Sequence, residues 1–362
     1  MNLLASDTQQ SYRESWQEQL QNAIRTPQEL AGAVGLSESA LGYSAAADAQ
    51  FPLLIPRAFA ARMRRSDPQD PLLRQVLAMP VEIQVHEGYS TDPVDEVSRY
   101  GGTPGVLQKY QDRALLVLTG QCAVNCRYCF RRHYPYGDNT QSTSDRRLAL
   151  KKLLDDKNLQ EIILSGGDPL LLPDAQIASI SDQIAASPND VIVRIHTRLP
   201  IVIPDRVTDA LISALQRPGM SVVIVLHCNH PNEIDLPTHS AIQKLVQAGL
   251  TVLNQSVLLA GVNDDADTLA QLSDCLFRAG ALPYYLHTLD KVAGAAHFDL
   301  PVSSARVLAA QLAAIRPGYL VPKLMVETPG ASSKRELAPD YIVAATQACE
   351  TPLPSTSLDN IP

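Results

Sequence analysis

Short apolar runs alternate with amphipathic stretches along the chain from about residue 106 onward. Continuous apolar runs bounded by turn-forming residues predict buried strands, and apolar positions at helical spacing predict helices between them. The predicted strands cover 114–119, 161–164, 191–195, 221–226, 251–253, 283–286 and 323–326, and the predicted helices lie near 143–156, 174–187, 205–216, 237–248, 265–279 and 303–315.

This alternation is typical of parallel strands joined by helical crossovers. We therefore predict an α/β fold. It is an incomplete (β/α)6 barrel of the TIM type, preceded by a helical N-terminal extension. Parallel barrels carry their active sites at the carboxyl ends of the strands, so candidate chemistry is sought in the segments that follow them.

The N-terminal part lacks the alternation. Residues 16–36 and 59–77 have helical spacing, interrupted by several prolines. We predict a helical extension over 1–105, a catalytic core over 106–330 and a C-terminal segment over 331–362. The Gly- and Pro-rich stretch 88–105 marks the transition into the core.

Composition excludes some classes of function. With 45% apolar and 19% charged residues, the 362-residue chain is typical of globular proteins. A net charge of −8 argues against a nucleic-acid-binding surface. The first residues are polar and lack the apolar region of a signal peptide, and no apolar run is long enough to span a membrane. We expect a cytoplasmic protein.

Three cysteines follow the first predicted core strand, namely Cys122, Cys126 and Cys129. Three thiolates on one loop can bind three irons of a four-iron cluster and leave the fourth iron open to a ligand. The alternative is a structural zinc site with His133 as fourth ligand. Zinc loops usually supply two separated pairs of ligands, so the spacing favours the cluster. Cys228, Cys275 and Cys349 occur singly and are expected to be small apolar residues.

Polar residues follow the later strands as well. They lie at 165–168, 194–198, 227–233, 254–256 and 284–290. A single polar residue at such a place is usually structural. A succession of them after neighbouring strands predicts a barrel mouth lined with hydrogen-bond donors and acceptors.

The spacing C-x3-C-x2-C, with Tyr128 before the last cysteine, resembles the signature of the radical S-adenosylmethionine (SAM) enzymes. The resemblance implies a [4Fe-4S] cluster whose free iron binds SAM and whose electron cleaves it to a 5′-deoxyadenosyl radical. It also implies SAM contacts from Gly166, Gly167 and Asp168, where Asp168 accepts a bond from the methionine ammonium, and from His227 and Gln255.

Residues 110–334 resemble lysine 2,3-aminomutases, radical SAM enzymes that also use pyridoxal 5′-phosphate (PLP). The matching motifs include Tyr110-Gln-Asp-Arg113, Leu-Ser-Gly-Gly-Asp168, His-Cys-Asn-His-Pro-Asn-Glu233 and Asn-Gln255-Ser-Val-Leu-Leu. Within the family, the motifs around the cysteines and before His297-Phe298 are most similar to the shorter branch that makes (R)-β-lysine for elongation factor P. Resemblance to this branch also implies that we expect no zinc-binding C-terminal extension of the clostridial type.

This resemblance assigns roles to individual residues. Lys334 would carry PLP, and Tyr110 and Arg113 would contact it. Arg131 would bind the α-carboxylate of the substrate. Asp290 and Glu327 would bind its ε-ammonium, although Glu327 stands where the lysine-metabolising branch has the shorter Asp.

The implied reaction converts L-lysine into (R)-β-lysine by moving the α-amino group to the β-carbon. It implies an electron donor of the flavodoxin or ferredoxin type and product use in elongation factor P modification, and it allows a homo-oligomer. Three other functions remain open on sequence alone. The first is an aminomutase for another amino acid, and Asp290 and Glu327 make arginine a better candidate than glutamate. The second is a PLP-independent activase that generates a radical on a partner protein. The third is a non-catalytic zinc module.

Overall fold

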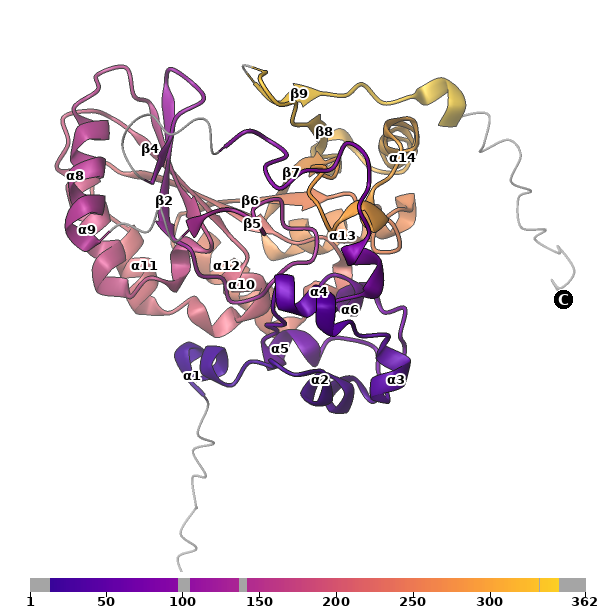
Figure 1. Cartoon of the computed structure of the whole chain (residues 1–362). Helices are drawn as coiled ribbons and strands as arrows, with labels where there is room; N and C mark the ends of the chain where they lie inside the picture. The colour runs from indigo at the N-terminus through magenta and orange to yellow at the C-terminus, as the bar shows by residue number, and fades with distance from the viewer. Residues whose placement is uncertain (1–13, 97–104, 137–141, 332, 345–362) are drawn as a thin grey trace, which may run out of the picture.

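The computed structural model describes residues 14–96, 105–136, 142–331 and 333–344. A nine-stranded sheet with its strands in chain order forms its centre (Figure 1). The strands β2 to β8 are parallel to one another. They are β2 (Arg113–Thr119), β3 (Glu161–Gly166), β4 (Ile192–Thr197), β5 (Ser221–His227), β6 (Thr251–Val257), β7 (Leu282–His287) and β8 (Lys323–Val326).

Two short antiparallel strands border the parallel ones. β1 (Val106–Leu107) pairs with β2, and β9 (Arg335–Glu336) pairs with β8. Among the described residues β1 and β9 do not pair with each other, so the sheet does not close. This architecture confirms the predicted incomplete (β/α)6 barrel.

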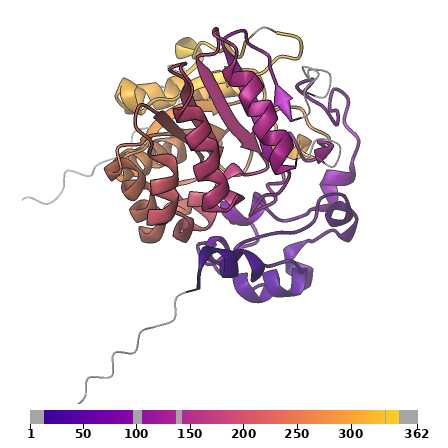
Figure 2. The same cartoon turned by 90° about the vertical axis from the view of Figure 1, so that its left-hand side faces the viewer.

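A helix follows each of the first six parallel strands and covers the outside of the sheet, as Figure 2 shows for the magenta and pink helices. They are α8 (Thr143–Leu154), α9 (Asp174–Ala185), α11 (Asp209–Leu215), α12 (Leu236–Gln247), α13 (Ala266–Ala279) and α14 (Val302–Ile315). The prediction of one helix over 205–216 is wrong in its first turn. A short helix α10 (Leu199–Val202) and a 3-10 turn η4 (Pro204–Arg206) come first, and Thr208 caps α11.

The strands alternate between two environments. In β4, Val193 and Ile195 are buried under the helices, whereas Arg194 and His196 face the inside of the barrel, where they line a cavity. This follows from the period of two in a strand. Each strand therefore supplies one row to the core and one row to the interior of the barrel.

The N-terminal segment forms short helices instead of two long ones. They are α1 (Trp16–Gln21), α2 (Pro27–Val34), α3 (Glu38–Leu41), α4 (Ala45–Gln50), α5 (Arg57–Ala60) and α6 (Pro71–Arg74). Pro27 occupies the first turn of α2, where its missing N–H costs nothing. The predicted helix over 59–77 is wrong between α5 and α6, because Ser66 adopts a positive φ and Asp70 caps a new helix start.

The same segment shares a continuous apolar core with the barrel. Leu30, Phe59 and Leu72 belong to one buried cluster with Leu116 and Ile162 from the sheet. Helix α5 packs on α10, and α1 packs on η4, on one side of the barrel (Figure 1). The boundaries at 105 and 330 remain a prediction, and much of the predicted C-terminal segment lies outside the described residues.

In the part of the chain that the structure describes, no helix is both long and apolar enough to cross a bilayer.

Candidate active site

One cavity of about 590 Å³ lies inside the barrel, where residues at the carboxyl ends of the parallel strands line it together with Arg113 and Ala114 at the start of β2. This volume is within the range of about 300–1,000 Å³ typical of ligand pockets. Every residue that the sequence assigned to a cofactor or to the substrate lines it: Tyr110, Arg113, Cys122, Cys126, Cys129, Arg131, Gly166, Gly167, Asp168, His227, Gln255, Asp290, Glu327 and Lys334. Residues far apart in the sequence thus meet in one place.

Strand register places the inward-facing side chains at matching levels. His227 at the end of β5 pairs in register with Gln255 on β6, and Gln255 pairs with Tyr285 on β7. Further along, His287 pairs with both Val257 and Met325. These side chains form two successive layers at the mouth of the barrel, because they stand on the same face of neighbouring strands.

The cysteine loop follows β2 and is held by backbone hydrogen bonds to the N-terminal segment. Asn125 N–H donates to Leu54 O at 3.1 Å, and Arg127 N–H donates to Gln75 O at 2.9 Å. Thus the helical extension shapes the loop that carries the cysteines.

The thiols of the loop form an electrostatically coupled group. Burial raises the pKa of Cys129 to about 11, and the neighbouring Cys126 thiol adds to the shift. Burial and the other two thiols also raise the pKa of Cys122. Burial and mutual repulsion therefore oppose the simultaneous ionisation of the three thiols. The positive charge of a polynuclear iron cluster would stabilise the three thiolates, so the site fits such a cluster.

The geometry differs from that of a single-ion site. Among the described residues, no group of three His, Cys, Asp or Glu side chains is close enough to hold one metal ion. Each cysteine of a four-iron cluster binds a different iron, so cluster ligands lie farther apart than the ligands of one ion. His133, the proposed fourth zinc ligand, has its Nε2 3.1 Å from the carbonyl oxygen of Ala293.

The two glycines after β3 are needed for packing between chain segments. A Cβ on Gly167 would lie 2.0 Å from the carbonyl oxygen of Gln121, and one on Gly166 would lie 2.4 Å from that of Thr119. Gly166 also has a φ of +121°. The resemblance implies that both glycines contact SAM, and in the structure the backbone before Cys122 also approaches them closely.

Asp168 connects two strand ends. Its carboxylate accepts hydrogen bonds from Thr197 Oγ1 at 2.7 and 2.9 Å and from the backbone N–H groups of Leu170, Arg198 and Leu199 at 2.8–3.0 Å. These donors engage both carboxylate oxygens, and the contact of Asp168 with the methionine ammonium of SAM, which the family resemblance implies, stays a prediction.

The aromatic residue of the cysteine motif contacts His227. Tyr128 Oη lies 2.8 Å from His227 Nε2. Burial lowers the pKa of His227 to about 3, and the Arg198 charge adds to the shift. His227 is therefore neutral at physiological pH and can offer its ring to a ligand without carrying charge.

Lys334 lies just before β9 and reaches into the cavity near two carboxylates. Burial lowers its pKa, although Asp290 and Glu327 oppose the shift. A lysine whose amine is more readily deprotonated is suited to bond covalently to an aldehyde. This property fits PLP.

Asp290 and Glu327 differ in their present partners. Burial raises the pKa of Asp290 to about 7, and Lys334 opposes this rise. Glu327 forms an ion pair with Lys109, and both side chains are largely buried, with exposed fractions of 13% and 16%. Both acids thus line the cavity near Lys334, and Glu327 also pairs with Lys109.

Arg131 is already bound to a carboxylate. Its Nε and Nη2 donate to Glu96 Oε2 and Oε1, both at 2.6 Å, in the two-pronged geometry that carboxylates prefer. Glu96 therefore occupies the fork that was assigned to the substrate α-carboxylate. This arrangement fits a carboxylate ligand at Arg131.

Tyr110 and Arg113 lie at the rim. The Arg113 guanidinium stacks on the Tyr110 ring at 4.5 Å and is held by Asp112 at 3.0 and 3.2 Å. An aromatic face beside a half-exposed guanidinium can hold a ring and its phosphate.

Several cavity residues have no assigned role in the sequence-based site. Glu96 lies outside every motif, and no sequence signal links it to Arg131. His196 and His287 line the cavity, and among the described residues their Nε2 atoms have no hydrogen-bond partner. Burial lowers the pKa of both well below the usual value. Their place on the inward face of a strand is the signal that could have identified them.

The remaining cysteines agree in part with the sequence analysis. Cys228 is fully buried, Cys275 is half-buried, and Cys349 lies outside the described residues.

Comparison with known proteins shows the family of the chain. The family model of the radical SAM superfamily matches residues 116–272. The chain is 46% identical to L-lysine 2,3-aminomutase of Escherichia coli K12 over 326 residues, which cover 90% of this chain and 95% of that protein. It is 43% identical to L-lysine 2,3-aminomutase of Haemophilus influenzae, over 92% of this chain and 98% of that protein.

A solved structure of SuiB from Streptococcus suis bound to S-adenosylmethionine aligns with a TM-score of 0.45 and 12% identity, over 61% of this chain and 51% of that one. The family assignment rests on the extent and identity of the two aminomutase matches, with the cysteine loop inside the matched superfamily region. The chain belongs to the lysine 2,3-aminomutase family of radical SAM enzymes.

Proposed function

We propose that this protein is an L-lysine 2,3-aminomutase that uses a [4Fe-4S] cluster, SAM and PLP to convert L-lysine into (R)-β-lysine. One observation carries the proposal. The residues assigned separately to the cluster, to SAM, to PLP and to the substrate all line a single cavity.

The cofactors, when bound, supply a radical and a conjugated imine that together allow nitrogen to migrate. In the proposed function Cys122, Cys126 and Cys129 hold the cluster and Lys334 holds PLP. Tyr110 and Arg113 position the cofactor ring and phosphate. The glycines 166–167 with Asp168 shape the SAM site, to which His227 and Gln255 contribute side chains.

Arg131 binds the substrate α-carboxylate in place of Glu96, and the two acids Asp290 and Glu327 select a cationic distal group. The side-chain carboxylate of a glutamate substrate would be repelled by these two acids, which disfavours glutamate as the substrate. The buried walls of the cavity exclude water from the radical.

The test is anaerobic incubation of reconstituted protein with SAM, PLP, dithionite and L-lysine, followed by chiral chromatography. We expect (R)-β-lysine, dependent on both SAM and PLP. Parallel reactions with L-arginine and L-glutamate test the substrate. Conversion of arginine but not of lysine would overturn the assignment, and iron-free protein containing zinc would overturn the cluster.

Substituting Lys334→Ala tests the PLP role directly. We expect loss of the absorbance band of bound PLP and a roughly 100-fold or greater loss of activity, because the lysine positions the cofactor. The iron content should not change. Lys323→Ala is the matched control, because Lys323 is exposed and pairs only with Glu336 among the interactions described. A Lys334→Ala protein that keeps both the band and the activity would show that Lys334 does not hold PLP, whereas a wild-type protein that is active without the band would favour a PLP-independent activase.

We also propose that the product serves the modification of elongation factor P and that a flavodoxin or ferredoxin supplies the electron. The cytoplasm is the expected location and a homo-oligomer is compatible with the proposal. Mass spectrometry detects a lysyl group on elongation factor P from cells with and without this protein, and chiral analysis of its acid hydrolysate tells β-lysine from α-lysine, which has the same mass. β-Lysine on elongation factor P from cells without the protein would contradict the first point.

A further inference from the structure

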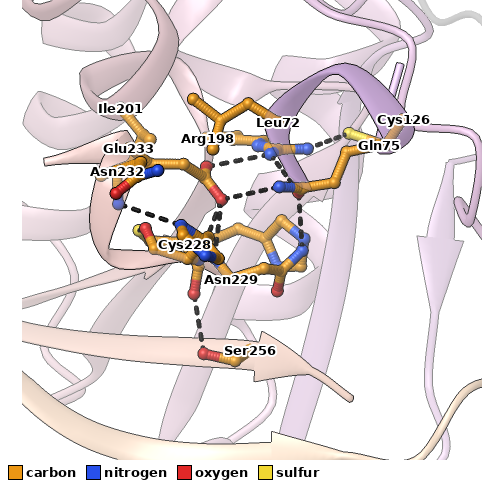
Figure 3. A network of polar contacts seen from close by, with 12 residues as sticks. Leu72, Gln75, Cys126, Arg198, Ile201, Cys228, Asn229, Asn232, Glu233 and Ser256 are labelled. Atoms are coloured by element: carbon orange, nitrogen blue, oxygen red, sulfur yellow. Dashed lines mark hydrogen bonds and ion pairs between the residues drawn. The ribbon is translucent and has the colours of Figure 1, made fainter. Parts of the chain in front are cut away.

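A buried arginine at the end of β4 contacts one of the three cysteines. Arg198 Nη1 lies 2.7 Å from Cys126 Sγ (Figure 3). The same nitrogen lies 2.6 Å from Tyr128 Oη. Arg198 is only 6% exposed. Its guanidinium therefore donates to a cysteine sulfur in a place that water scarcely reaches.

The other side of the guanidinium is fixed by two acceptors. Arg198 Nη2 donates to Gln75 Oε1 at 2.7 Å and to Glu233 Oε2 at 3.0 Å (Figure 3). The fully buried Glu233 also accepts from Gln75 Nε2 and from the backbone N–H groups of Asn229 and His230 at 3.0–3.1 Å. Four donors thus hold the carboxylate in place.

This network joins parts of the chain that are distant in sequence. Gln75 follows α6 in the N-terminal segment, Arg198 directly follows β4, and Glu233 belongs to the turn η5 (Pro231–Glu233) after β5. The guanidinium also lies 5.4 Å from the Phe59 ring centre and 5.8 Å from that of Tyr128. Because two acceptors and two aromatic rings hold the guanidinium, the donor cannot easily turn away from Cys126.

We propose that Arg198 is a positioning residue for the cluster, which orients Cys126 by an N–H···S hydrogen bond and raises the reduction potential of the cluster. The inference rests on the proposed function, because it requires that Cys126 binds iron. Reduction adds one electron from an external donor, without breaking a bond, and part of the added charge resides on the cysteine sulfurs. A cationic donor at such a sulfur stabilises the reduced cluster.

Glu233 acts in the opposite direction. Its negative charge balances Arg198, so removing that charge leaves the cation less compensated beside the sulfur. Arg198→Gln should therefore make the potential more negative, and Glu233→Gln should make it more positive. A purely structural network has no reason to give shifts of opposite sign.

The test is a redox titration of anaerobically reconstituted full-length protein with dithionite and mediators, followed by electron paramagnetic resonance. At the wild-type midpoint we expect Arg198→Gln to have a roughly tenfold lower ratio of reduced to oxidised cluster, which is about 59 mV for a one-electron couple. Arg198→Lys keeps the positive charge but cannot donate from two nitrogens as the guanidinium does, so it should shift the midpoint potential less than Arg198→Gln. The double variant Arg198→Gln/Glu233→Gln leaves no unpaired buried charge and is used if the single variant loses iron. It should also titrate below wild type, because the sulfur has lost its cationic donor.

Arg62 offers a matched control. It donates to Ile201 O at 2.7 Å and to Thr238 Oγ1 at 2.9 Å and contacts the Glu233 backbone, but no interaction with Cys122, Cys126 or Cys129 is described for it. Arg62→Lys and Arg62→Gln should leave the potential unchanged. An iron-replete Arg198→Gln protein, or the iron-replete double variant, that titrates like wild type would overturn the inference, as would an equal shift in the Arg62 variants. Absence of a reducible cluster in the wild-type protein would instead overturn the proposed function.

Discussion

Asp290 is a cavity residue whose carboxyl group changes its charge near neutral pH. Burial raises its pKa to about 7, while the nearby Lys334 ammonium acts against the rise. The carboxylate is therefore ionised above this pH and increasingly neutral below it. If Asp290 binds the ε-ammonium of lysine, only the ionised form does so effectively.

We expect kcat/KM for L-lysine to fall about tenfold per pH unit below about 7, because kcat/KM reports the ionisation of the free enzyme. In Asp290→Asn this acid limb should disappear, with a roughly 10- to 100-fold lower kcat/KM at pH 8 for the lost charged hydrogen bond, worth about 1.5–3 kcal/mol.

The control is Asp274→Asn, because Asp274 pairs with Arg316 and does not line the cavity. Its pH profile should match that of wild type. An unchanged acid limb in Asp290→Asn would show that another group titrates there.

At the scale of elements, the turn after β3 determines where the cysteine loop begins. Gly167 N–H donates to Thr119 O and Asp168 N–H donates to Gln121 O, both at 2.7 Å. These bonds bring the turn against the end of β2, where only glycine fits. The position of Cys122 thus depends on residues that follow it by more than forty positions.

Gly167→Ala should destabilise the protein by about 1–3 kcal/mol and lower the iron bound per chain, because its methyl group overlaps the Gln121 carbonyl. Thermal unfolding and iron analysis measure both effects. Gly32→Ala is the control, because a Cβ at Gly32 in α2 has no heavy atom within 4 Å. It should be neutral or slightly stabilising. Equal melting temperatures of the two variants would contradict the packing argument.

At the scale of the whole molecule, an ion network connects the N-terminal segment to the cysteine loop. Glu82 binds the guanidinium of Arg127 at 2.6 Å and that of Arg132 at 2.9 Å, and all three side chains are buried. The extension and the barrel therefore share charge pairs as well as an apolar core.

Glu82→Gln should lower the free energy of unfolding by about 3–5 kcal/mol, because it leaves two buried guanidinium groups without their carboxylate. Urea titration followed by circular dichroism measures the loss. Glu29→Gln removes an exposed pair with Arg57 from the same segment and should cost at most about 1 kcal/mol. Similar midpoints for the two variants would mean that the network contributes little to stability.

The pattern of apolar and polar residues was enough to predict the strands, most of the helices after them and the polar strand ends that line the cavity. These features depend on local periodicity and on the order of polar residues at strand ends, and parallel pairing brings those ends together. The family resemblance then supplied roles for residues such as Lys334 and Arg131, which the pattern alone does not distinguish from surface residues.

The hydrogen-bond and ion-pair partner of each polar group could not be predicted from the sequence pattern and is known from the tertiary structure. The pairing of Glu96 with Arg131, the saturation of Asp168 and the contact of Arg198 with Cys126 join segments that no sequence period relates. The N-terminal helices were interrupted for the same reason, because caps and packing against the barrel outweigh local helical spacing. Hydrogen bonds and ion pairs depend on distances of a few tenths of an ångström, which are set by the whole fold.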